Sequence, residues 1–390
     1  MKIAGIIAEY NPFHSGHAYH IEKTREITLC DYVVICMSGN FVQRGEAACM
    51  DKWRRAEMAL KCGADAVFEL PALFAVRTAD AFARGGVAVL DGIGCDYLCF
   101  GSENADIEYL KKAADIRENE PAEISELVKQ ALSEGKSHAR ALGEAAARYL
   151  DMPAEALNAP NNTLGVEYIR AIRRLGSQMQ PVAIERKGSY HAESMEEGGF
   201  ASASAIRKAI SEGDIEAAQA GVPENVREYL SGIRMHAPDD LLLHTLRRMT
   251  PEMIASLPDV GEGLENRVFK CAQTAATVEE LISEIKCKRY TQLRLMRLCA
   301  HAMLNLTREF ADQHPLPEYA RLIGMRSDAA PLLGEIGRRA KIDVVSDAAK
   351  LKDNEIFRLE CRATDLRALL CDDREERKAG QEFTRKFVKV

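Results

Sequence analysis

Apolar runs and amphipathic segments alternate along the first hundred residues of the chain. Four apolar runs have the length of buried strands, at residues 3–8, 32–37, 66–70 and 97–100. The segments between them have the period of helices, at about 15–29, 51–62 and 78–91. Strands that alternate with helices of this size predict a parallel sheet built from right-handed crossovers.

Helical patterns dominate the rest of the chain. Residues 106–150 are charged and helical, with breaks at Pro121 and Gly135, which predicts a helical insertion or cover. From about 215 to 390 the pattern is again helical, and only Val344 and Val345 indicate a short strand.

Three more elements are predicted between these helical stretches. They are a helix at 163–175, a strand at 181–185 and a helix that starts within 200–207. We therefore predict an α/β protein. A Rossmann-like parallel-sheet domain would span residues 1–212, with the helical insertion at about 106–150. A mostly α-helical C-terminal domain would span 213–390.

Three polar loops follow predicted strands at one edge of this sheet. Residues 9–20 follow the first strand, 38–40 follow the second, and 101–104 follow the fourth. Ligands of open parallel sheets bind outside the carboxyl ends of the strands, near a topological switch point. We expect the three loops to converge on one site.

The first of these loops has the chemistry of a phosphate site. A strand that leads into a helix start presents unpaired N–H groups and the positive end of the helix dipole. His14 and His17 share one face of that helix start, and Gly16 between them lets a nucleotide approach the backbone. The alternative is a pair of ordinary surface histidines, which the strand context and Pro12 disfavour. The turn predicts binding of the ATP triphosphate.

A second phosphate-binding segment is predicted near residue 204. Ser202 and Ser204 precede a helix with Arg207 in its first turn, where hydroxyls satisfy backbone donors and a cation holds phosphate. Alone, the segment would be a helix cap with a surface arginine, but the nearby histidine turn favours phosphate binding. Arg186 and Lys187, at the end of a predicted strand, add positive charge at the same rim.

Three further features are candidates for the site. Asn162 either caps a helix or contacts adenine or ribose through its amide. The loop 37–46 has more functional groups than a connector needs, and could close over a small substrate. Glu9 is expected to be buried beside the cations or near the histidines.

A basic stretch stands out at residues 286–297. On a helix Arg294 and Arg297 share a face, with Tyr290 one turn before them. Such a face suits contact with RNA phosphates and base stacking, although a solvated helix face is the usual role of such charges. The RNA-binding prediction comprises Lys288, Arg289, Arg294 and Arg297.

Composition narrows the class of protein. The 390 residues are 47% hydrophobic, as in globular chains, and the net charge of −7 argues against nucleic-acid binding through bulk charge. Eleven cysteines are scattered without a Cys-x-x-Cys pair, so we expect reduced thiols, with Cys36, Cys95 and Cys99 buried. The absence of a membrane-length apolar run and of room for a signal peptide predicts a cytoplasmic location.

Taken together, the motifs resemble one family within the His-x-Gly-His nucleotidyltransferases, the bacterial tRNA(Met) cytidine acetate ligases. The matching segments span nearly the whole chain. They are residues 9–17, 37–46, 100–103, 161–168, 186–187, 202–207 and 288–291. Ala203 stands where the family often has a hydroxyl.

The resemblance implies a reaction and a set of site residues. Acetate would attack the α-phosphate of ATP, and the wobble cytidine amine of elongator tRNA(Met) would then take the acetyl group. Catalytic roles would fall to His14, His17 and Arg207, Mg²⁺ would bridge phosphate oxygens, and neither a protein metal ligand nor an obligate protein partner is implied. The implied nucleotide contacts are Ile7, Ala8, Glu9, Tyr10, Asn11, Pro12, Phe13, His14, Ser15, Gly16, His17, Ala18, Tyr19, His20, Gly101, Asn162, Arg186, Lys187, Ser202 and Ser204.

Two other functions remain open at this point. One is a nucleotidyltransferase for a phosphorylated coenzyme precursor, which would leave the long helical half without a purpose. The other is a non-catalytic RNA-binding protein, which the intact His14, His17 and Arg207 disfavour. The choice between Asn161 and Asn162 as the nucleotide contact, the selection of acetate and the oligomeric state are also open.

Overall fold

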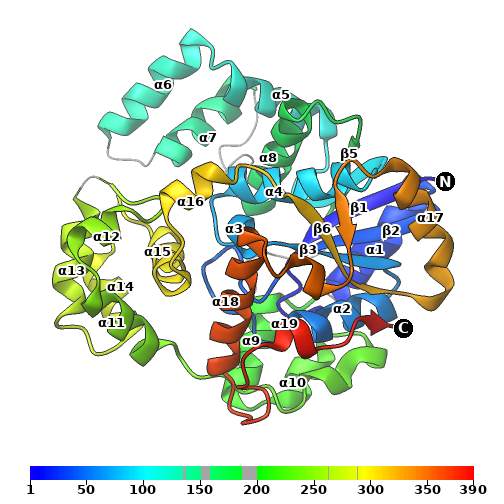
Figure 1. The fold of residues 1–390 in the computed structure, drawn as a ribbon. Helices are drawn as coiled ribbons and strands as arrows, with labels where there is room; N and C mark the ends of the chain where they lie inside the picture. The colour runs from blue at the N-terminus through cyan, green and yellow to red at the C-terminus, as the bar shows by residue number, and fades with distance from the viewer. Residues whose placement is uncertain (135–137, 151–158, 187–199, 262, 288) are drawn as a thin grey trace.

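An eight-stranded sheet forms the centre of the molecule (Figure 1). The structure is a computed structural model and describes residues 1–134, 138–150, 159–186, 200–261, 263–287 and 289–390. The strand order is β5-β4-β1-β2-β3-β6-β7, with β8 paired to β6. The strands are β1 (Ile3–Ala8), β2 (Tyr32–Ser38), β3 (Ala66–Leu70), β4 (Tyr97–Ser102), β5 (Gln180–Glu185), β6 (Tyr319–Met325), β7 (Asp343–Val345) and β8 (Val388–Lys389).

Strands β1 to β5 run parallel, as the alternating pattern predicts. In register, Ile6 of β1 lies between Ile35 of β2 and Cys99 of β4. The chain builds outward from β1 in both directions, through β2 and β3 on one side and through β4 and β5 on the other. The topological switch point therefore lies at the carboxyl end of β1. The predicted α/β class is confirmed.

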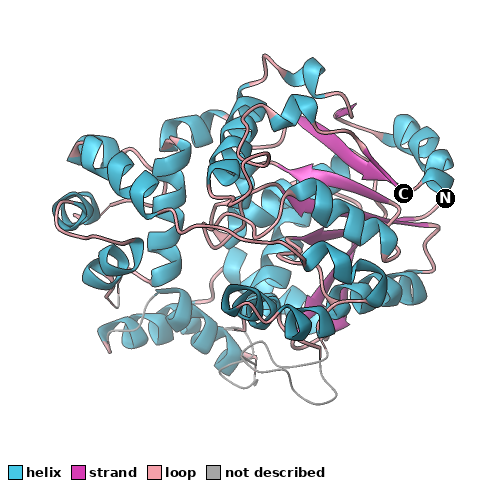
Figure 2. Cartoon of the chain, turned by 90° about the horizontal axis from the view of Figure 1, so that it is seen from below, coloured by secondary structure: helices cyan, strands magenta, loops and turns pink. Residues whose placement is uncertain are grey.

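Helices cover both faces of the sheet because its central strands are apolar on both sides (Figures 1 and 2). One face packs against α1 (Ser15–Thr28), α2 (Lys52–Lys61), α9 (Ala203–Glu212), α10 (Ile215–Ala220) and η1 (Glu224–Leu230). The other face packs against α3 (Ala72–Ala75), α4 (Ala79–Gly92), α8 (Pro160–Arg174), α17 (Ala330–Arg339) and α18 (Glu355–Leu369). Short 3₁₀ turns η2 (Ser327–Ala329) and η3 (Ala348–Leu351) join the last elements.

The predicted helical insertion is present. It consists of α5 (Ile107–Glu118), α6 (Ala122–Ser133) and α7 (His138–Tyr149). Pro121 stands at the N-cap of α6, which confirms the predicted break there, whereas Gly135 lies outside the described residues. Helix α5 packs against α8, and α6 pairs with α7 at the edge of the molecule (Figure 1).

A second group of helices has its own apolar core beside the sheet (Figure 1). We call it the helical group. It comprises α11 (Asp239–Arg248), α12 (Pro251–Ala255), α13 (Leu264–Ala272), α14 (Val278–Ile285) and α15 (Gln292–Leu304). Helix α16 (Arg308–Gln313) then leads back to the sheet. Among the described helices, none is both long and apolar enough to span a bilayer.

The last part of the chain returns to the sheet, which the sequence pattern does not predict. Strand β6 pairs antiparallel with β3, and β7 and β8 both pair parallel with β6. Val344 and Val345 do lie in a strand, β7. The helical class of the C-terminal half is confirmed with this addition, and the division of the chain at residue 213 stays a prediction.

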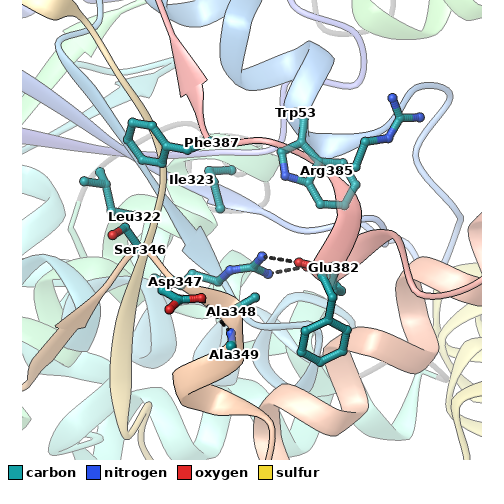
Figure 3. A pocket seen from close by; sticks show the side chains of 12 residues that line it. Trp53, Leu322, Ile323, Ser346, Asp347, Ala348, Ala349, Glu382, Arg385 and Phe387 are labelled. Atoms are coloured by element: carbon teal, nitrogen blue, oxygen red, sulfur yellow. Dashed lines mark hydrogen bonds and ion pairs between the residues drawn. The ribbon is translucent and has the colours of Figure 1, made fainter.

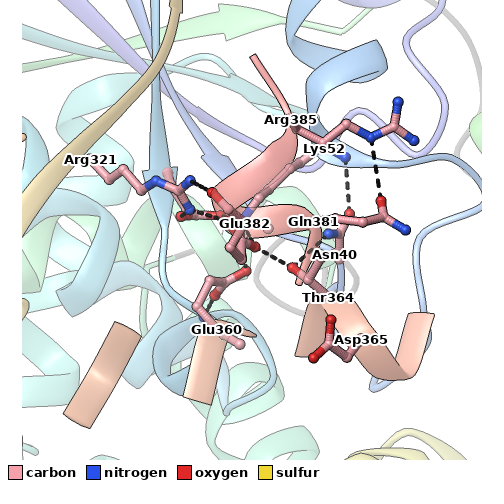
Figure 4. A network of polar contacts seen from close by, with 12 residues as sticks. Asn40, Lys52, Arg321, Glu360, Thr364, Asp365, Gln381, Glu382 and Arg385 are labelled. Atoms are coloured by element: carbon pink, nitrogen blue, oxygen red, sulfur yellow. Dashed lines mark hydrogen bonds and ion pairs between the residues drawn. The ribbon is translucent and has the colours of Figure 1, made fainter. Parts of the chain in front are cut away.

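A buried network of charges joins this returning segment to the first part of the chain (Figure 4). The ammonium of Lys52, at the start of α2, lies among the carboxylates of Glu69, Glu360 and Glu382. Lys52, Glu69 and Glu360 are fully buried, so each charge depends on the others. Arg321 of β6 adds a second cation through ion pairs with Glu69 and Glu382. Glu382 belongs to α19 (Gln381–Thr384).

All eleven cysteines are free thiols, as the sequence predicts. Cys36, Cys95 and Cys99 are buried in the two cores of the sheet.

We expect the stability of the protein to fall as pH rises because of this network. Burial, with the neighbouring charge of Glu69, raises the pKa of Glu360 from 4.5 to about 8. The folded protein then holds a proton that the unfolded chain has lost. This contribution to stability is complete below about pH 4.5 and is lost as pH rises through 8. Glu360→Gln stays neutral, so its melting temperature should rise relative to wild type between pH 6 and 9.

The control is Glu375→Gln, where the carboxylate side chain is 76% exposed and pairs with Lys378. Its difference from wild type should not change over that range. A constant difference between Glu360→Gln and wild type from pH 6 to 9 would contradict the prediction.

Candidate active site

The turn after β1 is folded by its own histidines. His14 is the N-cap of α1, and its Nδ1 accepts a hydrogen bond of 3.1 Å from the Gly16 N–H. The His17 Nδ1 in turn accepts the His14 N–H at 3.2 Å, which completes a reciprocal capping box. The predicted helix start is confirmed, and the histidines also satisfy two of its orphan donors.

These contacts fix the tautomer of both rings. Each Nδ1 is an acceptor, so in the neutral imidazole the proton must be on Nε2. The two rings stack with centroids 3.6 Å apart, and Tyr10 and Phe13 pack against His17 at 4.6 and 5.6 Å. The prediction that His14 and His17 share one face is therefore confirmed. Together the rings present two Nε2–H donors with a fixed orientation.

The histidines stay uncharged. Burial, followed by the nearby charge of Arg186, lowers the pKa of His14 to about 3. Burial, with the charges of His14, Arg186 and His20, also holds the pKa of His17 well below its ordinary range. The pKa of His20, one turn further along α1, falls to about 4 for the same two leading reasons as that of His14. At neutral pH positive charge must come from arginine.

Two arginines lie next to the turn. Arg186 directly follows β5, and its backbone N–H donates to the Ser102 carbonyl at 3.0 Å. Arg207 of α9 donates to the Asn11 carbonyl of the turn at 2.7 Å and to the Ser204 hydroxyl at 3.3 Å. The structure thus brings the two predicted phosphate-binding segments together. Lys187 lies outside the described residues.

Ser202 and Ser204 differ in their surroundings. Ser202 is the N-cap of α9 and accepts the Ala205 N–H at 3.1 Å, as its position before a helix predicts. Ser204 is exposed, and Arg207 donates to its hydroxyl. Ser202 therefore shapes the helix start, whereas Ser204 stands at the surface with Arg207.

Gly101 and Asn162 lie at the end of β4. Gly101 is the fifth residue of that strand rather than part of a loop, and the Arg186 side chain covers it: a Cβ built there would lie 3.2 Å from the Arg186 Cγ. The side-chain oxygen of Asn162 accepts from the Ser102 hydroxyl at 2.5 Å and from the N–H groups of Glu103 and Asn104. Asn162 is buried and holds the loop after β4, while Asn161 donates to Glu103.

A buried arginine holds the loops after β1 and β2 together, and local sequence gives no sign of it. The Arg55 guanidinium donates to the carbonyls of Glu9 at 2.5 Å, Ser38 at 3.2 Å and Gly39. Its Nε donates to the Met50 carbonyl at 3.2 Å. Four carbonyls from three segments thus converge on one cation.

The loop 37–46 is largely buried in this structure, and its closure over a small substrate stays a prediction. Phe41 and Val42 are 1% exposed, and the Gln43 N–H donates to the Glu9 carboxylate at 2.6 Å. A Cβ on Gly45 would lie 2.4 Å from the Met296 carbonyl, so the loop rests directly on α15. The half-buried Glu9 carboxylate, whose pKa is raised by burial, therefore anchors this loop.

The predicted RNA-binding residues belong to the helical group. Arg294 and Arg297 lie on α15, Arg289 is exposed just before it, and Lys288 lies outside the described residues. The proposed stacking role of Tyr290 is wrong, because its ring is 6% exposed and packs in the core of the helical group. Arg294 donates twice to the Asp259 carbonyl, at 2.9 and 2.8 Å, so part of its guanidinium is structural.

A cavity of about 200 Å³ lies beside β6, beneath the C-terminal segment (Figure 3). Trp53, Glu382, Arg385 and Phe387 lie around it, and the Arg385 guanidinium stands 5.9 Å from the Trp53 ring. None of the described residues of the histidine turn lines this cavity. The candidate active site is therefore assigned to the carboxyl edge at β1 and not to this hollow.

Known proteins resemble this chain in sequence and in fold. A profile of the HIGH Nucleotidyl Transferase family matches residues 1–382. The chain is 36% identical over 405 residues to the tRNA(Met) cytidine acetate ligase of Thermoanaerobacter sp. (strain X514), with both chains fully covered. It is 38% identical over 415 residues to that of Acetivibrio thermocellus, again with full coverage. Thermotoga maritima TmcAL bound with alpha-thio ATP has a TM-score of 0.91 at 32% identity, covering 100% of this chain and 99% of that one.

Replacement of Arg55 should loosen both loops of the site. Arg55→Lys keeps the charge, but a single ammonium cannot reach four carbonyls, so buried acceptors lose their donors. We expect a loss of about 2–5 kcal/mol in the free energy of unfolding measured with urea. Arg54→Lys, whose side chain is 37% exposed, is the control and should change it by about 0.5 kcal/mol or less. Equal effects of the two changes would contradict the role of Arg55.

Proposed function

The chain belongs to the HIGH nucleotidyl transferase family, and from this we propose that it is an ATP-dependent tRNA(Met) cytidine acetate ligase. One observation supports this above the others: the likeness to ligases of that name extends from the histidine turn through the helical group to the end of the chain. A transferase for a coenzyme precursor would not need the helical group. ATP is the nucleotide, as in the structural relative that holds its thio analogue.

The proposed reaction has two steps. An acetate oxygen attacks the α-phosphorus of ATP, the bond to the bridging oxygen breaks, and acetyl-adenylate and pyrophosphate form. The exocyclic amine of the wobble cytidine of elongator tRNA(Met) then attacks the acetyl carbon, AMP leaves, and the amine loses a proton. Both steps need positioning and charge neutralisation more than a covalent nucleophile.

The histidines supply oriented hydrogen bonds rather than charge. Because His14 and His17 are neutral with Nε2 protonated, each donates one hydrogen bond to phosphate oxygen. The donors are already held in place by the helix cap and the ring stack, so they need no reorganisation as charge develops on the phosphates.

The arginines supply the charge. Arg207 is anchored on the turn through the Asn11 carbonyl, and a guanidinium has donors left after that contact. Arg186 lies near His14, His17 and His20 and can move off Gly101 to meet the departing pyrophosphate. Lys187, Ser202, Ser204 and Asn162 remain proposed contacts of the nucleotide.

Magnesium is proposed to enter with the ATP phosphates. Within the described ranges, the carboxylates close enough together to hold a metal are those of Glu69, Glu360 and Glu382. The Lys52 ammonium stands among them, so they form an ion-paired network and not a magnesium cage. Magnesium commonly binds substrate phosphates with few protein ligands, which suits this site.

Binding of tRNA is assigned to the helical group. Its exposed Arg289, together with Lys288, Arg294 and Arg297, forms the proposed RNA surface. The cytoplasm, where tRNA is found, is the proposed location.

His17→Ala should lower the rate of acetate-dependent exchange of pyrophosphate into ATP by about 100-fold, the usual loss for one transition-state donor. The change removes an Nε2–H donor and half of the capping box. The control His236→Ala, whose side chain is 58% exposed, should match wild type. Melting temperatures separate lost chemistry from lost folding. Exchange by a folded His17→Ala at the wild-type rate would contradict the role of the turn.

The dependence on pH gives a second test of the neutral histidines. With the pKa of His14 at about 3, exchange should show no histidine inflection between pH 5.5 and 8. An inflection near pH 6.5 that disappears in His17→Ala would show that a charged imidazole takes part.

Arg289→Glu should weaken binding of elongator tRNA(Met) several-fold, because it replaces a phosphate-binding cation with an anion, and exchange without tRNA should be unaffected. Filter binding at two salt concentrations measures the effect. The control is Arg358→Glu, on α18 with a side chain 56% exposed, and unchanged binding by both variants would contradict the RNA surface.

A further inference from the structure

A second cavity lies where the helical group meets the sheet. Its volume is about 430 Å³, and none of the described residues of the histidine turn lines it. The lining residues are Thr78, Asp259, Val260, Arg294, Arg297 and Arg308. They come from the start of α4, from the loop before α13, and from α15 and α16. We call this hollow the arginine cavity.

The lining of the arginine cavity carries more positive than negative charge. Three lining guanidiniums face one lining carboxylate, that of Asp259. Arg77, next to the lining Thr78, is a further cation; burial lowers its pKa, and Asp259, Asp312, Asp80 and Arg84 act on it. Burial also lowers the pKa of Arg297, on which Asp259, Arg294 and Arg77 act. These arginines lie close together although burial and their mutual repulsion both disfavour their charged forms.

Several of these guanidiniums have unused donors. Arg294 donates to the Asp259 carbonyl and Arg308 to the Val260 carbonyl at 2.6 Å, contacts that hold the loop before α13. The Nε atoms of Arg77, Arg84 and Arg297 are buried without a hydrogen-bond partner. The Arg297 Nε is 3.9 Å from the Asp259 carboxylate, beyond hydrogen-bond distance. The Asp259 Oδ2 that faces Arg297 is also buried without a hydrogen bond. Buried donors without acceptors are costly, and a phosphate oxygen among these arginines would give them acceptors.

The walls of the arginine cavity are fixed in place. The buried His301 of α15 contacts the Val76 carbonyl through Nε2 at 2.7 Å, which ties α15 to the segment that carries Arg77 and Thr78. Thr78 is the N-cap of the 14-residue α4 and makes no capping hydrogen bond. The positive end of that helix therefore adds to the field of the arginines. Asp80, in the first turn, is paired with Arg174 at 2.9 Å.

We propose that the arginine cavity is a phosphate-binding site, separate from the ATP site at the histidine turn. Guanidiniums bind phosphate oxygens through paired hydrogen bonds, and the cavity offers such donors from both of its walls. The phosphate belongs either to the RNA backbone, a source that rests on the proposed function, or to a free phosphate compound. Arg294 and Arg297 would then act at the junction of the two parts and not on an open helix face.

Phosphate binding is measured first, by calorimetry with inorganic phosphate, on protein saturated with alpha-thio ATP so that the histidine turn is filled. Wild type should bind a further phosphate. Arg77→Gln and Arg297→Gln should each weaken that binding by tenfold or more. Arg358→Gln is the control and should bind as wild type does. Both changes also remove a cation that acts on the Asp259 carboxylate, so the melting temperature of each variant is measured and affinities are compared between folded proteins.

The source of the phosphate is settled by binding of elongator tRNA(Met) at several salt concentrations. If the RNA backbone is the source, Arg77→Gln lowers affinity and reduces the salt slope by about one phosphate contact. If tRNA binding is unchanged while inorganic phosphate binding is lost, a free phosphate compound is the source. If folded Arg77→Gln and Arg297→Gln bind both like wild type, the proposal is wrong.

Exchange of pyrophosphate into ATP is measured in parallel on wild type and on Arg77→Gln. If the wild-type protein shows no acetate-dependent exchange, with or without tRNA, the proposed function is wrong. The proposal of a phosphate site in the arginine cavity is not contradicted by that result. Phosphate binding at the arginine cavity is measured independently of that activity.

Discussion

The structure depends on one buried lysine. The Lys52 ammonium lies without solvent contact among three carboxylates, from β3, α18 and α19. Removing Glu69 or Glu382 would leave an uncompensated buried charge, which typically costs about 3–5 kcal/mol. The Lys52 N–H also donates to the Asn40 side chain, in the loop after β2. Lys52 thus holds the end of the chain against the sheet. It also fixes a loop of the active edge, by which we mean the carboxyl edge of the sheet at β1, where the candidate active site lies.

At the active edge, hydrogen-bond orientation and positive charge come from different residues, although a single protonated histidine could supply both. Both Nδ1 atoms are used to cap α1, so the rings cannot rotate, and burial keeps them neutral. Charge comes instead from Arg186 and Arg207 on other elements. Orientation is therefore set locally by the turn, whereas charge is brought in by the tertiary fold. The loop 37–46 lies between this edge and α15, which places the helical group in direct contact with the catalytic part.

Local sequence predicts those features whose causes are local. The runs that form β1, β2 and β4 carry no charged residue, and the turn from Glu9 to His17 contains its own cap, so these features can be predicted from the sequence. Strand β6 is not, because Arg321 interrupts its apolar run and is neutralised by Glu69 and Glu382, far away in the chain. The role of Arg55 cannot be predicted from local sequence either, since its partners are backbone carbonyls of other segments. Tyr290 is buried by residues of the helical group that are distant in sequence, so its neighbours along the chain do not indicate its burial.

The closing of the sheet by the end of the chain has a consequence for biosynthesis. Strand β3 ends at Leu70, but its neighbour β6 begins only at Tyr319, and β8 ends one residue before the C-terminus. At roughly 5–20 residues per second, the ribosome takes tens of seconds to supply the missing edge. During that time the edge of β3 in the nascent chain is open to wrong pairing. Lys52 also lacks two of its partners, Glu360 and Glu382, until they are synthesised. This topology therefore leaves the edge of β3 without its partner strand until β6 has been synthesised.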